Sequence, residues 1–157
     1  MKVNIALLTV TDTRTIDNDK SGGILVNKFK EANHNLIERK ICKDNKDDIV
    51  VILREWLKNE KIDVIITTGG TGLTGRDITP EALNEVAEKH IPGFGEIFRN
   101  ISIKTVGTSA IQSRACAVLS NGKYIFALPG SSGGVTDAWE GILKHQLDIN
   151  HKPCNFV

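Results

Sequence analysis

Hydrophobic and polar positions follow two different spacings along this chain. Apolar residues of segment 46–60 recur at the i, i+3, i+4, i+7 and i+8 spacing of one helical face, so this segment predicts an amphipathic helix. Apolar stripes and helix-start signals predict further helices at 22–33, 80–90, 93–104, 108–117 and 135–147. Short apolar runs predict buried strands at 3–10, 36–41, 62–67 and 123–128.

This alternation of strands and helices predicts a three-layer α/β/α fold, in which a mostly parallel sheet carries helices on both faces. The length and the lack of a repeat, linker or low-complexity tract favour one domain over 1–157. Ligands of such sheets bind beyond the carboxyl ends of the strands. We expect four polar or glycine-rich loops to converge at that rim, namely 11–23, 42–48, 67–79 and 129–134.

The loop 67–79 is the most informative segment of the chain. It holds Gly69, Gly70, Thr71 and Gly72, and it leads into a helix for which Thr79 is the predicted N-cap. Glycines accept positive φ and bring backbone N–H groups close to an anion. A structural turn needs only one or two glycines, so the composition of this loop favours anion binding.

The same loop contains a literal G-x-G-x-x-G pattern over 70–75, which is typical of dinucleotide-binding turns. In that fingerprint the helix opens within the glycine motif. Here residues 76–79 intervene before the helix, and the Gly-Lys-Ser/Thr ending of a P-loop is absent. The pattern therefore gives only weak support to a nicotinamide-dependent oxidoreductase.

Charged residues beside this loop suggest phosphate chemistry. Arg76 offers a guanidinium fork for phosphate. Asp77 is either a Mg²⁺ ligand beside bound phosphates or a loop carboxylate that pairs with Arg76 or with backbone N–H groups. Asp44 precedes the 46–60 helix, where it or Asn45 serves as N-cap, and its local context favours the cap.

Two other strand-to-helix turns resemble this arrangement. Ser21 and Gly22 offer a hydroxyl and an amide at the start of the first helix, although a capping role for Ser21 is the simpler local interpretation. Gly130, Ser131 and Ser132 follow the last strand in the same way. Three such turns at strand ends exceed what a fold requires, so together they favour a ligand site.

The overall composition argues against nucleic acid and membrane as partners and indicates the cellular compartment. The net charge of +1, with both signs interspersed, gives no basic face for nucleic acid. No apolar run approaches the roughly 20 residues that cross a bilayer. Three cysteines without metal-ligand spacing fit a reducing compartment, so we expect the cytoplasm.

The run 68–82 closely resembles the molybdenum-cofactor biosynthesis family that contains the MogA and MoaB proteins. Its most specific features are Gly-Gly-Thr-Gly at 69–72 and Arg-Asp-x-Thr-Pro-Glu-Ala at 76–82. The turn at 129–131 and the ending at 153–156 are similar to the MoaB branch in particular.

This resemblance implies a molybdopterin pocket, a homo-oligomer (trimer or hexamer) and a partner protein that inserts molybdate. Active members adenylylate molybdopterin with ATP and Mg²⁺ and release pyrophosphate. Two aspartates that match Asp44 and Asp77 carry this activity and hold Mg²⁺, which overrides the cap interpretation of Asp44. A non-catalytic molybdopterin carrier or assembly protein is the alternative. The residues expected to bind substrate are Asp12, Ser21, Gly22, Gly69, Gly70, Thr71, Gly72, Arg76, Thr79, Gly130, Ser131 and Ser132.

Overall fold

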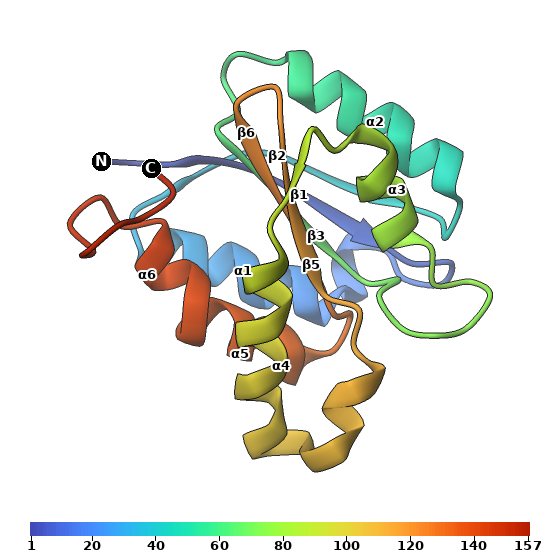
Figure 1. The fold of residues 1–157 in the computed structure, drawn as a ribbon. Coiled ribbons are helices and arrows are strands. Elements are labelled where there is room, and N and C mark those ends of the chain that lie inside the picture. Colours follow the sequence, from blue (N-terminus) through green and yellow to red (C-terminus); the bar gives the residue numbers. More distant parts are fainter.

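The computed structural model describes all 157 residues, which form a three-layer α/β/α sandwich around one six-stranded sheet (Figure 1). The strand order is β2-β1-β3-β6-β5-β4. Strands β2, β1, β3 and β6 pair in parallel, and β5 runs antiparallel to both β6 and β4. The predicted mostly parallel sheet is thus confirmed. The strands are β1 (Asn4–Val10), β2 (Asn35–Cys42), β3 (Val64–Thr68), β4 (Lys89–His90), β5 (Cys116–Ser120) and β6 (Lys123–Leu128).

Helices cover both faces of the sheet (Figure 1). One face carries α1 (Lys20–Glu31), α4 (Pro92–Val106), α5 (Ser132–Ala138) and α6 (Lys144–Gln146). The other face carries α2 (Lys46–Lys58) and α3 (Thr79–Val86). A π-helical segment, Trp139–Leu143, joins α5 to α6. No helix combines the length and the apolar character that a membrane span requires.

The middle of strand β1, residues 5–8, is an unbroken apolar run because helices cover both faces of the sheet. Ile5 and Leu7 pack into the core under α1, α4 and α5, whereas Ala6 and Leu8 pack into the core under α2 and α3. Successive side chains of a strand point to opposite faces. Because both faces are covered by helices, each of the central positions 5–8 of β1 is apolar.

Two predicted helices are partly wrong. The helix expected over 80–90 ends at Val86, and Lys89–His90 pair with β5 as a short edge strand. The segment 108–117 holds only a 3₁₀ turn, Gly107–Gln112, and then enters β5. Pairing with β6 overrides the local helical pattern there. The sequence does contain a signal for a β5–β6 hairpin, namely Asn121-Gly122. These two residues form the hairpin turn, and both take positive φ.

The turn after β3 lets the ends of three strands approach one another closely. Gly69 and Gly70 have φ of 101° and 70°. A Cβ on Gly69 would lie 2.3 Å from the carbonyl oxygen of Val10, and a Cβ on Gly130 would lie 3.2 Å from the Cα of Gly69. The carboxyl ends of β1, β3 and β6 therefore meet at a point that tolerates no side chain.

Substitution of this glycine tests that packing. Gly69→Ala should lower the free energy of unfolding by at least about 2 kcal/mol, because the new methyl group meets a backbone carbonyl at a strained φ. Gly75→Ala in the same loop is the matched control, since its added Cβ meets no atom within 4 Å. We expect the control to stay within about 0.5 kcal/mol of the unchanged protein in urea unfolding. Equal losses of stability in the two variants would show that the packing around Gly69 does not exclude a side chain.

Candidate functional site

A cavity of about 640 Å³ opens at the carboxyl ends of the parallel strands. Each of the four predicted loops contributes to its wall, through Arg14, Asp44, Gly70 and Gly130. The expected convergence of these loops at one rim is therefore confirmed. Helix α4 and the 3₁₀ turn after it form another part of the wall, which is mostly polar and which we did not predict from the sequence. Its polar residues are Ser102, Thr105, Ser109, Gln112 and Ser113.

Many, but not all, of the predicted site residues line this cavity. Those that line it are Asp44, Gly69, Gly70, Thr71, Gly72, Asp77, Gly130 and Ser131. Those that lie outside its wall are Asp12, Ser21, Gly22, Arg76, Thr79 and Ser132. The wall also includes Arg14 and Asp137, for which the sequence had suggested no role.

The glycine loop of the cavity wall contains backbone N–H groups that have no backbone partner. The N–H groups of Gly70 and Thr71 donate to no backbone carbonyl, whereas that of Gly69 donates to the Leu128 oxygen at 3.0 Å. Thr79 holds the loop from beneath, because its hydroxyl donates to the Gly69 oxygen (2.8 Å) and its N–H donates to the Gly70 oxygen (3.0 Å). Thr79 is the first residue of α3 and is fully buried, so its prediction as the N-cap is wrong.

Arg114 braces the loop from the other side. Its Nε donates to the Gly72 oxygen and its Nη2 donates to the Asp77 oxygen, both at 2.7 Å. The backbone N–H of Arg114 donates to the Thr71 oxygen at 2.9 Å. The guanidinium also pairs with Glu81 in the first turn of α3. Because three loop carbonyls are taken by Arg114, the orientation of the loop is set.

Asp77 is held within its own turn. Its carboxylate accepts from the N–H (2.9 Å) and the hydroxyl (2.7 Å) of Thr74. Burial works against ionisation of Asp77, but these hydrogen bonds, with the Gly72 amide and the charge of Arg114, lower its pKa overall. Arg76 does not pair with it. Asp77 therefore presents an ionised carboxylate to the cavity.

Asp44 lies on the same wall in the loop after β2. The N-cap of α2 is Asn45, whose side chain accepts from the Asp48 N–H at 3.1 Å, so Asp44 is not needed for capping. Burial and the negative charge of Asp77 raise the pKa of Asp44. Asp44 and Asp77 thus form a pair of carboxylates that repel each other.

This pair fits a magnesium ion. Mg²⁺ is usually bound by one or two carboxylates together with phosphate oxygens of a substrate. A divalent cation between Asp44 and Asp77 would relieve the repulsion that raises the pKa of Asp44. No third histidine, cysteine or acidic residue joins them in a metal-binding group.

Arg76 and Asp12 were expected to bind substrate, but both lie outside the cavity wall. Their side chains form an ion pair with each other, and the Arg76 side chain is 72% exposed. The Asp12 carboxylate also accepts from the Asp44 N–H at 3.1 Å. Asp12 therefore positions the loop that carries Asp44, whereas Arg76 lies outside the cavity wall.

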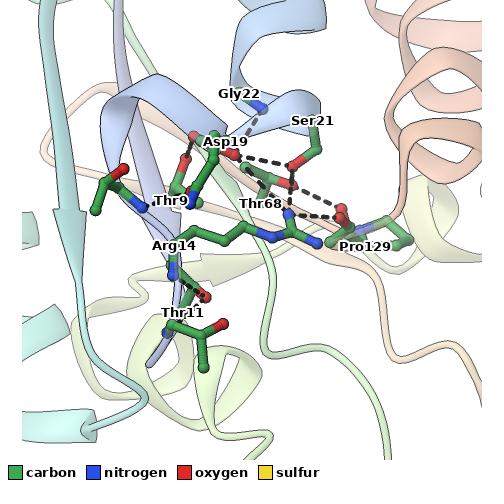
Figure 2. Close-up of polar contacts among 12 residues, drawn as sticks. Thr9, Thr11, Arg14, Asp19, Ser21, Gly22, Thr68 and Pro129 are labelled. Atoms are coloured by element: carbon green, nitrogen blue, oxygen red, sulfur yellow. Dashed lines mark hydrogen bonds and ion pairs between the residues drawn. The ribbon is translucent and has the colours of Figure 1, made fainter.

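A buried carboxylate, Asp19, organises the base of the site (Figure 2). Asp19 accepts from the Thr9 hydroxyl (2.6 Å), from the Gly22 N–H (3.1 Å) and from Nη2 of Arg39 (3.1 Å). Burial opposes its ionisation, but these hydrogen bonds and the charge of Arg39 lower its pKa overall. Asp19 rather than Ser21 is therefore the N-cap of α1. Ser21 is fully buried beside it.

The turn after β6 is capped in a similar way. The Ser131 hydroxyl accepts from the Gly134 N–H at 3.0 Å, so Ser131 is the N-cap of α5. Ser132 is exposed and lies outside the cavity wall. At the far side of the cavity, the Asp137 carboxylate accepts from the Thr105 hydroxyl at 3.1 Å.

The fold and the site together define an α/β domain with a ligand cavity at the carboxyl ends of its parallel strands. Residues 6–148 match the family model described as "Probable molybdopterin binding domain". The chain belongs to this molybdopterin-binding family.

Similar proteins agree with this assignment. The chain is 42% identical over 152 residues to molybdenum cofactor biosynthesis protein B of Escherichia coli K12, covering 97% of the chain and 89% of that protein. A crystal structure of molybdenum cofactor biosynthesis protein B matches with a TM-score of 0.91 and 40% identity, covering 94% and 92% of the two chains. The tungsten cofactor synthesizing protein MoaB from Pyrococcus furiosus matches with a TM-score of 0.82 and 33% identity, covering 92% of each chain. The family and these relatives together support a role for the chain in molybdenum cofactor biosynthesis.

The Asp19 network makes a prediction about stability. Asp19→Asn keeps the size of the side chain but leaves Arg39 without its anion, so the free energy of unfolding should fall by about 3 kcal/mol at pH 7. Because the pKa of Asp19 is lowered in the folded protein, its contribution is lost as the pH falls through that pKa. Urea unfolding measures the difference. A loss below about 1 kcal/mol at pH 7 would count against a central role for Asp19.

The carboxylate pair makes a prediction about titration. Asp77→Asn removes one of the two causes that raise the pKa of Asp44, so this pKa should fall toward its ordinary value of about 3.9 while burial keeps it above that value. A pH titration of the ¹³C signal of the Asp44 carboxyl group measures the change. An unchanged or higher pKa in the variant would show that the two carboxylates do not interact.

Proposed function

We propose that this protein transfers the adenylyl group of ATP to the terminal phosphate of molybdopterin and releases pyrophosphate. One observation carries the proposal: Asp44 and Asp77 line the same cavity as Gly70 and Thr71, whose N–H groups donate to no backbone carbonyl. Carboxylates that suit Mg²⁺ beside amides that suit phosphate are what a nucleotidyl transfer needs.

The reaction requires little covalent chemistry from the protein. A phosphate oxygen of molybdopterin attacks the α-phosphorus of ATP, the bond from that phosphorus to the bridging oxygen breaks, and pyrophosphate leaves with the electron pair. The second pKa of a phosphate monoester is about 6, so at neutral pH the attacking oxygen carries no proton and needs no general base. Positioning and charge stabilisation therefore account for most of the rate.

The residues of the cavity have separate roles in this reaction. Gly70 and Thr71 hold phosphate oxygens through their N–H groups, and Arg114 keeps the loop in the required orientation. Asp44 and Asp77 hold Mg²⁺, and when bound this ion offsets the charge of the triphosphate and of the leaving pyrophosphate. The polar wall of α4 and Asp137 offer hydrogen-bonding partners to the pterin ring.

The proposed assembly is a homo-oligomer in the cytoplasm that passes the adenylylated product to a molybdate-insertion partner. Apolar side chains exposed on α4 and the turn after it support association between copies of the chain. They are Ile97, Ile103, Val106 and Ile111.

Pyrophosphate release tests the proposed activity. Asp77→Asn should lower the rate of release from ATP, Mg²⁺ and molybdopterin by at least about a hundredfold, because the substituted amide is a poor Mg²⁺ ligand. Molybdopterin affinity should change little. The matched control is Asp17→Asn, an exposed aspartate outside the cavity, which should keep the full rate.

Two results would overturn parts of the proposal. Full pyrophosphate release by Asp77→Asn would remove Asp77 from the reaction. Calorimetric titration of the unchanged protein distinguishes the alternative class: a protein that binds molybdopterin but takes up no Mg-ATP is a carrier and not an adenylyltransferase.

A further inference from the structure

Arg14 is a charged residue of the cavity wall to which neither the resemblance nor the proposed function assigns a role. The charged side chains of the wall are Arg14, Asp44, Asp77 and Asp137, so Arg14 is its only cation. A cavity that receives phosphorylated ligands needs positive charge to balance them. We infer that Arg14 binds a phosphoryl group of the ligand, in the place that the sequence had suggested for Arg76.

The guanidinium of Arg14 is fixed at one end and free at the other. Nη1 donates to the Ser21 hydroxyl at 3.2 Å (Figure 2). It also donates to the Gly130 oxygen at 3.2 Å. The Nε and Nη2 atoms donate to no protein atom, and the side chain is 40% exposed. A guanidinium with Nε and Nη2 available presents the parallel donors that bind two oxygens of one phosphate.

The charge of Arg14 is also left for a ligand. The nearby Asp19 carboxylate lies 3.1 Å from Nη2 of Arg39, with which it forms a hydrogen bond, but 3.9 Å from Nη1 of Arg14. Arg39 is the more buried of the two arginines and neutralises Asp19. The group of Asp19, Arg39 and Arg14 therefore has a net positive charge. Because Arg39 neutralises Asp19, this charge resides on Arg14 at the cavity wall.

The position of Arg14 agrees with phosphate binding. Its Gly130 contact lies where the turn after β6 meets Gly69 of the glycine loop. Arg14 thus approaches the junction of the two turns, and the next residue along the loop is Gly70 with its unpaired N–H. Arg76, by contrast, is paired with Asp12 outside the wall. The ligand class is a phosphate monoester or polyphosphate, which share the phosphoryl group that Arg14 binds.

Inorganic phosphate is the probe for the test, because it needs no turnover. Titration is followed by ¹H–¹⁵N NMR without metal. Arg14→Gln should weaken phosphate binding by at least about tenfold, because a charged hydrogen-bond donor is lost. Arg14→Lys keeps the charge without the fork and should recover part of the affinity. Arg76→Gln is the matched control and should bind phosphate within about twofold of the unchanged protein.

The melting temperatures of the variants separate binding from folding. Phosphate binding within about twofold in a folded Arg14→Gln protein would overturn the inference, as would a tenfold loss in Arg76→Gln. If Arg14→Gln does not fold, the inference is tested in the unchanged protein by following the side-chain Nε–H signal of Arg14 during the phosphate titration. It should shift as phosphate saturates the site while that of Arg76 does not, and a signal that does not move overturns the inference.

This inference rests on the proposed function only for the identity of the phosphorylated ligand. In the pyrophosphate-release assay, Arg14→Gln should raise the KM for ATP if Arg14 binds the nucleotide, or the KM for molybdopterin if it binds the monoester. Unchanged values of both would contradict the inference. Loss of phosphate binding in Arg14→Gln, together with no pyrophosphate release by the unchanged protein, would confirm that Arg14 binds phosphate. The same pair of results would reject adenylyl transfer as the function.

Discussion

The close approach of three strand ends is the constraint on which the rest of this structure depends. Strands β1, β3 and β6 end so near one another that Gly69 lies against the Val10 carbonyl on one side and Gly130 on the other. Only glycine fits this junction. Gly70 and Thr71, which follow this junction, lie in the cavity wall, and their N–H groups donate to no backbone carbonyl. Thr79 from below and Arg114 from the outside hold the loop in that shape.

Electrostatics divides the cavity into two regions around this junction. Asp44 and Asp77 form a negative region on the loops after β2 and β3, where burial and the charge of Asp77 raise the pKa of Asp44. Arg14 and the backbone N–H groups form a positive region where the loops after β1, β3 and β6 meet. A metal and a phosphate chain need these two environments side by side. Asp19 supports the positive region, because it anchors α1 and Arg39 while leaving the charge of Arg14 available.

The sheet and the convergence of the four loops could be predicted because they depend on local patterns. The apolar run of β1 and the striped helix α2 are decided by burial, which the sequence records directly. Strand β5 was missed because its pairing with β6 is a tertiary effect, although Asn121-Gly122 marked the hairpin. For the site, residue type suggested Asp77 and the family resemblance added Asp44, and both line the cavity. The sequence suggested Arg76 and not Arg14, since only the fold shows that Arg76 pairs with Asp12 outside the wall.

Mass analysis of the reaction products tests the central claim most directly. Purified protein is incubated with molybdopterin, ATP and Mg²⁺, and the pterin fraction is examined. Adenylyl transfer predicts molybdopterin that carries one added AMP through a phosphate-to-phosphate bond, and pyrophosphate in equal amount. Unmodified molybdopterin beside intact ATP, with the protein folded and the pterin bound, would contradict the account.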